Sequence, residues 1–289
     1  MLASRLVAPL TGERTEEAVR YLAERYPSLW VTTVGKSVMG RPIWMLRVGQ
    51  GEPRLLYVAT HHSLEWICGS ALLLFCEEYL KEEARNRAPH GTIYLVPCLN
   101  PDGVELVAKG IRAGGVLSHL VRRATGGMGD TSRWQANARG VDLNHNYEAG
   151  FAAYKPVERA LGITGPAPTR YSGEYPLSEP ETRALAGAVD TLSPHAVLSL
   201  HTQGREIYAS RAARAAGALL ARRIGYTLGT PEGAAAYGGL TDWLDVRGMP
   251  ALTVECGLGV NPLPPETLPQ VYREVLPLLW HAPRLLGKM

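Results

Sequence analysis

The chain has 289 residues, 46% of them hydrophobic, and a formal net charge of +3. This length suits one large α/β domain or two small ones, and the apolar content is enough for an ordinary globular core. A charge so close to balance, with Lys and Arg scattered along the chain, argues against a nucleic-acid partner. No stretch approaches the roughly 20 apolar residues of a membrane helix, so we expect no membrane association.

The N-terminus and the cysteines of the chain bear on its cellular location. The first ten residues contain no apolar core long enough for a signal peptide. A cytoplasmic protein is therefore expected, unless a leader has been trimmed. Cys68, Cys76, Cys98 and Cys256 lie in apolar surroundings without a CxxC pair, which predicts buried free thiols rather than disulfides or ligands.

Helix and strand patterns alternate along the first half of the chain. Residues 15–26 form an amphipathic helix pattern that Pro27 ends, and strands at 30–34 and 41–48 flank a turn. A buried strand at 54–60 leads into a long apolar helix that starts at Trp66. A strand at 92–98 ends in Asn100-Pro-Asp-Gly103, whose composition predicts a turn. Residues 110–140 predict a long loop with one short helix.

The second half continues the alternation. Residues 154–175 are dense in Pro, Gly and Tyr and predict irregular structure, after which Ser178 and Glu181 fit a capping box that opens a helix. A strand at 196–200 ends at His201, and one at 251–254 ends at Glu255. Helices are expected at 212–224, around Trp243 and at 265–286. Without repeats or a linker, residues 1–289 predict a single α/β domain with a mixed or mostly parallel sheet and helices on both faces.

Polar side chains stand where the predicted strands end. His62 and Glu65 follow the first buried strand, Asn100 follows the second, and His201 and Glu255 end two later ones. Sites in open α/β sheets form beyond the carboxyl ends of the strands. These residue types, gathered at one edge of a sheet, are what a metallohydrolase needs.

The pattern predicts one zinc ion held by His62, Glu65 and His201. Two imidazoles and one carboxylate leave a fourth position open for water. Glu255 would be the general base that takes a proton from this water as it attacks a carbonyl carbon. Two alternatives stay open: His61 could replace His62 as ligand, and Glu255 could instead pair with a buried Arg.

A family resemblance runs through these motifs. His62-Ser-Leu-Glu65-Trp66, Asn100-Pro-Asp-Gly103, Gly140-Val-Asp-Leu-Asn144, Ser178-Glu-Pro-Glu181, His201 and Thr253-Val-Glu255 occur in the order found in the zinc carboxypeptidase A-type family. The chain resembles this family from about residue 14 to its end. The resemblance implies a mixed eight-stranded sheet, the same zinc ligands and the same general base. It also gives Asp142 the role of orienting a zinc-bound His.

Two positions depart from the digestive members of that family. Asn144 matches the Asn of an Asn-Arg pair that holds a substrate carboxylate, but His145 stands in place of the Arg, and Leu64 replaces another Arg. A His is charged only when its pKa is raised, so it replaces an Arg poorly as a carboxylate ligand. The stretches around Asn144, Tyr171, His201 and Gly257 resemble the bacterial branch of γ-D-glutamyl-meso-diaminopimelate peptidases.

That branch implies a peptide or muropeptide substrate rich in carboxylates, so cationic side chains are expected in the cleft. Arg139, Arg133 and Arg205 are the candidates for a substrate contact, and one of them is expected to polarise the scissile carbonyl. Tyr237 lies near the position of a mobile substrate-closing Tyr in the family.

Three functions are weighed on this basis. The first is a zinc metallopeptidase that hydrolyses the γ-D-Glu–diaminopimelate bond of peptidoglycan stem peptides. The second is a conventional metallocarboxypeptidase that releases C-terminal amino acids. The third is a catalytically dead, peptide-binding relative, against which the intact set of His62, Glu65, His201 and Glu255 argues. The oligomeric state is not indicated by the sequence.

Overall fold

A mixed eight-stranded sheet forms the centre of the molecule. The computed structural model describes residues 1–288, without the side chains of residues 234 and 235. In the order β1-β2-β4-β3-β5-β8-β6-β7, the inner neighbours β4, β3, β5 and β8 pair in parallel. The β1–β2, β2–β4 and β8–β6 pairs are antiparallel, and β6–β7 is parallel. The strands are β1 Trp30–Lys36, β2 Pro42–Gln50, β3 Arg54–Ala59, β4 Gly91–Val96, β5 Ala196–His201, β6 Glu206–Ala209, β7 Thr227–Leu228 and β8 Ala251–Glu255.

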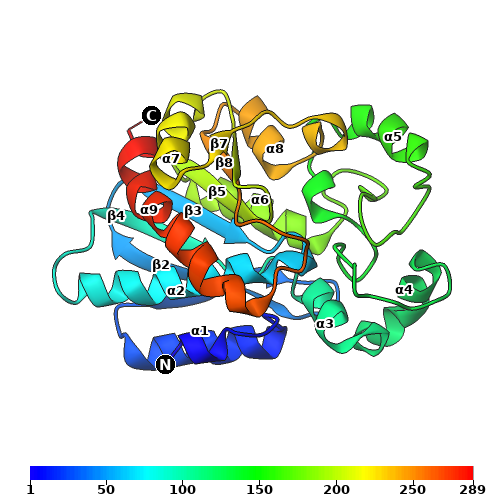
Figure 1. Cartoon of the computed structure of the whole chain (residues 1–289), viewed down its shortest axis with the longest axis horizontal. Helices are drawn as coiled ribbons and strands as arrows, with labels where there is room; N and C mark the ends of the chain where they lie inside the picture. The colour runs from blue at the N-terminus through cyan, green and yellow to red at the C-terminus, as the bar shows by residue number, and fades with distance from the viewer. Residues whose placement is uncertain (289) are drawn as a thin grey trace.

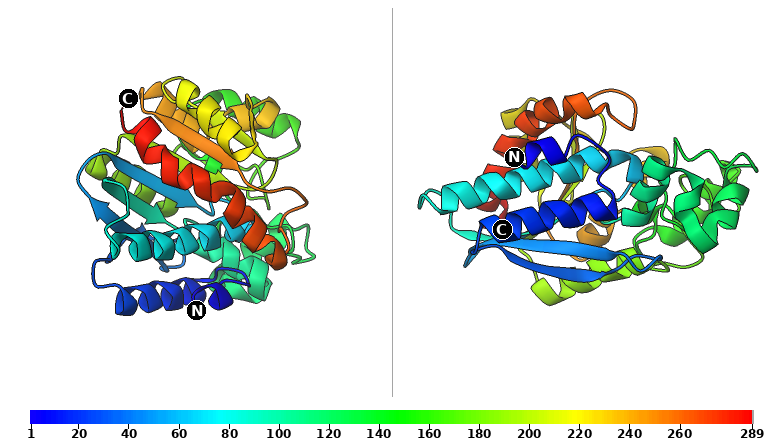
Figure 2. Two further views of the ribbon diagram at one scale, coloured as in Figure 1. Left: turned by 60° about the vertical axis from the view of Figure 1, so that its left-hand side comes forward. Right: turned by 90° about the horizontal axis from the view of Figure 1, so that it is seen from below.

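Helices cover both faces of the sheet, as the sequence predicted. One face carries α1 Gly12–Arg25, α2 Trp66–Glu83, α7 Arg214–Ile224 and α9 Leu268–Leu286, and the other carries α6 Pro180–Leu192 and α8 Leu240–Val246. Figures 1 and 2 show α1, α2 and α9 together on the first of these faces. Among residues 1–288, none of the helices combines the length and apolar character that a membrane span requires.

Strand alternation explains why the inner strands are apolar on both sides. Leu55, Tyr57 and Ala59 of β3 pack into the core under α2 and α9, whereas Leu56 and Val58 pack into the core under α6 and α8. Successive residues of a strand point to opposite faces. A strand covered on both faces therefore reads as a continuous apolar run, which is the pattern that made β3 recognisable.

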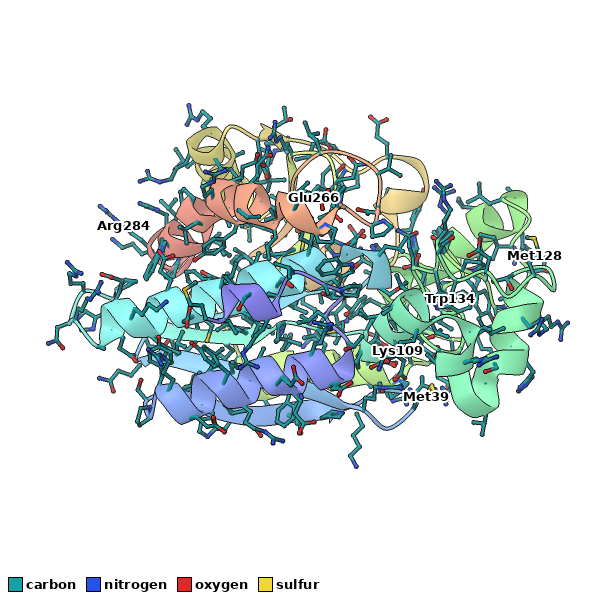
Figure 3. All side chains as sticks on the ribbon, turned by 60° about the horizontal axis from the view of Figure 1, so that its bottom comes forward. Met39, Lys109, Met128, Trp134, Glu266 and Arg284 are labelled. Atoms are coloured by element: carbon teal, nitrogen blue, oxygen red, sulfur yellow. The ribbon has the colours of Figure 1, made fainter. Side chains whose placement is uncertain are left out.

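A shell of short helices and loops lies beyond one end of the sheet. It contains α3 Pro101–Lys109, η3 Ile111–Leu117, α4 Ser118–Ala124, η4 Leu143–His145 and α5 Phe151–Ala160. These green segments lie together on the right of Figure 1. A small core of Leu106, Val121, Trp134 and Ala136 joins α3, α4 and the loop that follows α4. In Figure 3, Trp134 lies inside this shell and Met128 lies at its outer edge.

Four local predictions differ from the structure. Asn100 caps α3 with its side chain and Pro101 occupies the first helical position, so the predicted turn is a helix start. Residues 151–160 form α5, despite Pro156, where irregular structure was expected from residue 154. Residue Glu179, not Ser178, is the N-cap of α6, and Glu181 makes no capping bond there. The short strands β6 and β7 were not predicted.

The four cysteines match their prediction. Cys68, Cys76, Cys98 and Cys256 are all free and buried. They therefore pack as small apolar side chains within the core.

Candidate active site

Three parallel strands bring the predicted site residues to one edge of the sheet. His62 and Glu65 follow β3, with Glu65 ending the 3₁₀ turn η2 Ser63–Glu65. His201 is the last residue of β5 and pairs in register with Glu255, the last residue of β8. Because β3, β5 and β8 are parallel, their carboxyl ends meet at the same edge.

His62, Glu65 and His201 form a candidate metal-binding group. Their ligand atoms all lie within 4.8 Å of one another. Glu65 places Oε1 2.9 Å from Nδ1 of His62 and Oε2 2.9 Å from Nδ1 of His201. The two Nδ1 atoms are 3.4 Å apart.

The donor set fits a zinc ion. Oε2 of Glu65 is buried and makes no hydrogen bond to any described residue, although it lies close to an imidazole. A buried carboxylate oxygen in this state is costly unless a cation satisfies it. Two imidazole nitrogens and a carboxylate are the ligands of a catalytic zinc site with one open position.

The Nε2 atoms of both imidazoles also have hydrogen-bond partners. Nε2 of His62 lies 3.2 Å from Oδ1 of Asp142, and Nε2 of His201 lies 2.9 Å from Oγ of Ser199. Such contacts fix the ring orientation and keep the proton on Nε2, which frees Nδ1 for a metal. Asp142 was expected in this role. Ser199 was missed, although its position two residues before His201 puts it on the same face of β5.

Glu65 has a partner from the far end of the chain. Nδ2 of Asn261 donates to Oε1 of Glu65 at 3.3 Å and to the carbonyl of Thr202 at 2.9 Å. The hydroxyl of Thr202 donates to Oδ1 of Asn261 at 2.7 Å. The loop after β8 is thereby tied to the metal group. The sequence stretch Gly257–Pro264 was noted as a family motif, but no role for Asn261 was predicted from it.

Burial and the charges of neighbouring groups shift the pKa values of this metal-binding group in opposite directions. Burial raises the pKa of Glu65, but the neighbouring imidazoles outweigh it and hold the pKa at about 2. Burial lowers the pKa of His62, but Glu65 and Asp142 outweigh it and raise that pKa well above the usual value. The carboxylates therefore give the site a strong preference for positive charge, whether a proton or a metal ion supplies it.

His61 serves another purpose. Its Nε2 lies 3.0 Å from the hydroxyl of Tyr147 and its Nδ1 lies 3.3 Å from Oγ of Ser199. Burial, assisted by the charges of His201 and His62, lowers the pKa of His61 well below its usual value. The ring is thus a buried neutral group beneath the site, which favours His62 over His61 as ligand.

A cavity of about 190 Å³ opens beside the metal group. Its lining includes His62, Asn144, His145, Thr241 and Glu255. Burial raises the pKa of Glu255 to about 7. The imidazoles of His201 and His62 oppose this rise, and the charges of Glu65 and Glu206 add to it. A carboxylate with such a pKa is suited to accept a proton near neutral pH.

His145 and Asn144 form one wall of this cavity. Nδ1 of His145 lies 2.8 Å from the carbonyl oxygen of Tyr237, and its ring stacks on Tyr154 with 4.2 Å between centroids. Oδ1 of Asn144 accepts a hydrogen bond from the main-chain N of Leu240. His145 and Asn144 are therefore fixed in place, with Nε2 and Nδ2 left for a ligand.

The three candidate arginines lie elsewhere. Arg205 pairs with Glu274 of α9, and Arg139 lies 3.5 Å from Glu179 beside a different cavity. Arg133 is exposed. None of them belongs to the described lining of the cavity at Glu255. Tyr237 lies closer to the cavity than these arginines do. Its main-chain carbonyl oxygen contacts His145, which lines the cavity.

Asn100 turns out to be a structural residue. Its Nδ2 donates to the carbonyls of His61, Gln135 and Ala136, while its Oδ1 accepts from the main-chain N of Gly103. The side chain joins the end of β3 to the shell and caps α3. Its position at a strand end was predicted correctly, but it contributes no ligand.

The fold and the site together define a metallohydrolase with one metal centre at the edge of a mixed α/β sheet. A family model described as zinc carboxypeptidase matches residues 15–210. The chain therefore belongs to the zinc carboxypeptidase (peptidase M14) family, and it is a zinc metallopeptidase that acts on peptide substrates. The expected family, fold and cofactor are confirmed.

Relatives within the family add detail. The chain is 33% identical to γ-D-glutamyl-L-diamino acid endopeptidase 1 of Lysinibacillus sphaericus, over 89% of this chain and 68% of that protein. It is 30% identical to the human carboxypeptidase N catalytic chain, over 64% of this chain and 41% of that protein. Carboxypeptidase A of Helicoverpa armigera has the same fold, with a TM-score of 0.75 at 19% identity over 96% of this chain and 73% of that chain. The expected resemblance to the bacterial γ-D-glutamyl branch is borne out by the first of these.

Proposed function

We propose that the protein hydrolyses the amide bond that joins γ-D-Glu to a diamino acid in peptidoglycan stem peptides, with residues 1–289 acting as one catalytic domain. The convergence of His62, Glu65 and His201, with His62 and Glu255 lining one cavity, carries this proposal. The similarity over 89% of the chain to an endopeptidase named for γ-D-glutamyl-L-diamino acid bonds supports the substrate class.

Each side chain then has a defined task. His62, Glu65 and His201 would hold the ion through their Nδ1 atoms and a carboxylate, and Asp142 and Ser199 keep both rings in that orientation. Zinc, when bound, lowers the pKa of a water ligand and polarises the scissile carbonyl. Glu255 accepts a proton from the attacking water and passes it to the nitrogen of the amide bond. The carbon–nitrogen bond breaks, and the products are a carboxylate and an amine.

The cavity argues against a general carboxypeptidase. Release of any C-terminal residue requires a cation for the terminal carboxylate, and an Arg fork is the side chain best suited to it. The described lining beside Asn144 has His145 at this place and contains neither Lys nor Arg. We therefore favour a substrate selected by its side chain over one selected by its free α-carboxylate.

The direct test uses three peptides and a mass spectrometer. Zinc-loaded protein is incubated with L-Ala-γ-D-Glu-meso-diaminopimelate, with the same peptide joined through the α-carboxyl of Glu, and with hippuryl-phenylalanine. Cleavage of the γ-linked peptide between Glu and the diamino acid is expected, with the other two left intact. Release of phenylalanine at a higher rate would instead establish the carboxypeptidase.

We also propose that the substrates are small muropeptides inside the cell. Four free buried cysteines suit a reducing compartment. Fractionation of cells that express the native gene should recover the protein with cytoplasmic markers, and recovery with the cell wall would refute this location.

A further inference from the structure

A chain of hydrogen bonds lies beneath the metal group, and its far end has no task in the reaction described above. Nε2 of His201 lies 2.9 Å from Oγ of Ser199, and this oxygen lies 3.3 Å from Nδ1 of His61. Nε2 of His61 lies 3.0 Å from the hydroxyl of Tyr147. All four side chains are at most 1% exposed. Through its hydrogen bonds, His61 therefore reaches the ligand His201 by way of Ser199.

The metal side of His201 decides where the first proton of this chain stands. Nδ1 of His201 lies 2.9 Å from Oε2 of Glu65 and 3.4 Å from Nδ1 of His62. A metal ion takes the lone pair of Nδ1, so the ring carries its proton on Nε2 and donates it to Oγ of Ser199. His201 is ready to bind an ion only in this tautomer.

Ser199 by itself does not enforce that tautomer. A hydroxyl group can donate as well as accept, and its hydrogen rotates to suit its partners. If Oγ of Ser199 donated to Nε2 of His201, the ring proton would stand on Nδ1 and block the metal. An acceptor on the other side of the hydroxyl removes this choice, and the structure places Nδ1 of His61 there.

We propose that His61 is a positioning residue that sets the tautomer of His201 through Ser199. Nδ1 of His61 accepts the hydroxyl proton of Ser199, which leaves Oγ as an acceptor for the Nε2–H of His201. The proton of His61 then stands on its own Nε2 and is donated to the hydroxyl oxygen of Tyr147. The buried ring thereby keeps Nδ1 of His201 open for the ion, whatever peptide the enzyme cuts.

The proton positions can be tested in the wild-type protein. Long-range proton–nitrogen NMR of protein with isotope-labelled histidine separates a ring nitrogen that bears hydrogen from one that does not. In the zinc-loaded form, His61 and His201 should both bear their hydrogen on Nε2. A hydrogen on Nδ1 of His61 would overturn the proposal, because that nitrogen could then not accept from Ser199.

Two substitutions of similar size separate the acceptor from the ring. His61→Asn keeps an oxygen close to the position of Nδ1, whereas His61→Leu removes every acceptor. Both lose the ring, which stacks on His201 with 5.3 Å between centroids, and both lose the contact with Tyr147. Zinc affinity, measured by competition with a chelator, should fall roughly tenfold in His61→Leu and stay within about threefold of wild type in His61→Asn.

A double-mutant cycle tests whether His61 acts through Ser199. In a Ser199→Ala background, His61→Leu should change zinc affinity by less than about twofold, because the hydroxyl that connects the two imidazoles is gone. A tenfold loss in that background, or equal losses in His61→Leu and His61→Asn, would overturn the proposal and leave His61 as a ring that only fills space.

The measurements remain decisive if a variant does not fold. In that case the hydrogen positions in the wild-type protein decide the question alone. None of the readouts needs a substrate, so this inference and the proposed function can fail separately.

Discussion

The metal group and the substrate cavity share a wall, yet they are built differently. The metal ligands stand at the ends of β3 and β5, where neighbouring parallel strands fix their spacing. The cavity instead draws mostly on η4, β6, α8 and the segments between them, together with Thr253 and Glu255 of β8. Some of its side chains, such as those of Asn144 and Asp242, are partly exposed and depend on one or two local contacts. The sheet therefore determines where chemistry occurs, and short peripheral elements determine what is bound.

This difference has a physical origin. A strand end buried among neighbours has few alternative conformations, because register and packing fix the backbone. A short helix such as α8 can change its exposed side chains at little cost in stability. We therefore expect large losses of zinc binding and turnover from substitutions at the strand ends, and smaller losses from substitutions farther from the ion.

The largest effect is expected from His201→Ala. Removal of one of three ligands leaves Glu65 and His62 with too few donors to hold the ion in a buried site. The variant should bind less than one zinc per chain by elemental analysis and show no measurable turnover. His119→Ala, which changes an exposed His of α4, should retain both. Full zinc occupancy in the His201 variant would show that the ion is held elsewhere.

Glu255→Gln should come next, with zinc retained and turnover lost. The amide cannot accept a proton from water, and a general base typically contributes roughly 10²–10⁴-fold in rate. The measurement is kcat on the γ-linked peptide together with zinc content. A variant that keeps its rate would remove Glu255 from the reaction, although it pairs in register with His201.

The sequence alone predicted the site residues that stand at strand ends, but not the other residues that position them. His62, Glu65, His201 and Glu255 could be located because each follows a continuous apolar run. Ser199 could have been found as well, since it shares a strand face with His201. Asn261 could not, because its contact with Glu65 joins residues 196 positions apart in the sequence. Strand β7, with two residues, is too short for any periodic signal.

A smaller effect is expected from Ser199→Ala. The hydroxyl holds Nε2 of His201 at 2.9 Å, and loss of such a contact typically lowers metal affinity roughly 10–100-fold. Competition with a chelator measures that affinity. Ser70→Ala is a matched control, because the hydroxyl of Ser70 is equally buried and has no described partner. Equal zinc affinity in both variants would mean that Ser199 does not orient His201.

The start of α6 should respond to pH through Glu181. Burial, with help from Asp102 and Glu179, raises the pKa of Glu181 to about 7 from the usual 4.5. Between those values the folded state keeps a proton that the unfolded state has lost. The contribution of Glu181 to stability therefore falls as the pH rises from about 4.5 to 7 and stays low above it.

Glu181→Gln should abolish this part of the pH dependence. The linkage is worth roughly 2.5 kcal/mol between pH 5 and pH 8, so the difference in thermal midpoint between wild type and variant should change by roughly 5–10 °C over that range. Glu266→Gln, at an exposed position labelled in Figure 3, serves as the control and should track the wild type. A constant difference at all pH values would mean that Glu181 is ionised throughout.

The smallest effect is expected from Arg205→Gln. Its guanidinium is paired with Glu274 on α9, and a partly exposed pair of this kind contributes roughly 0–1 kcal/mol to stability. Catalytic efficiency should stay within about threefold of wild type, whereas a substrate contact would cost about tenfold or more. Arg223→Gln, at an exposed position of α7, is the control and should leave efficiency at the wild-type value. If Arg205→Gln lowered efficiency tenfold or more, Arg205 would be a substrate contact, and substrate would approach the ion from the side of α9.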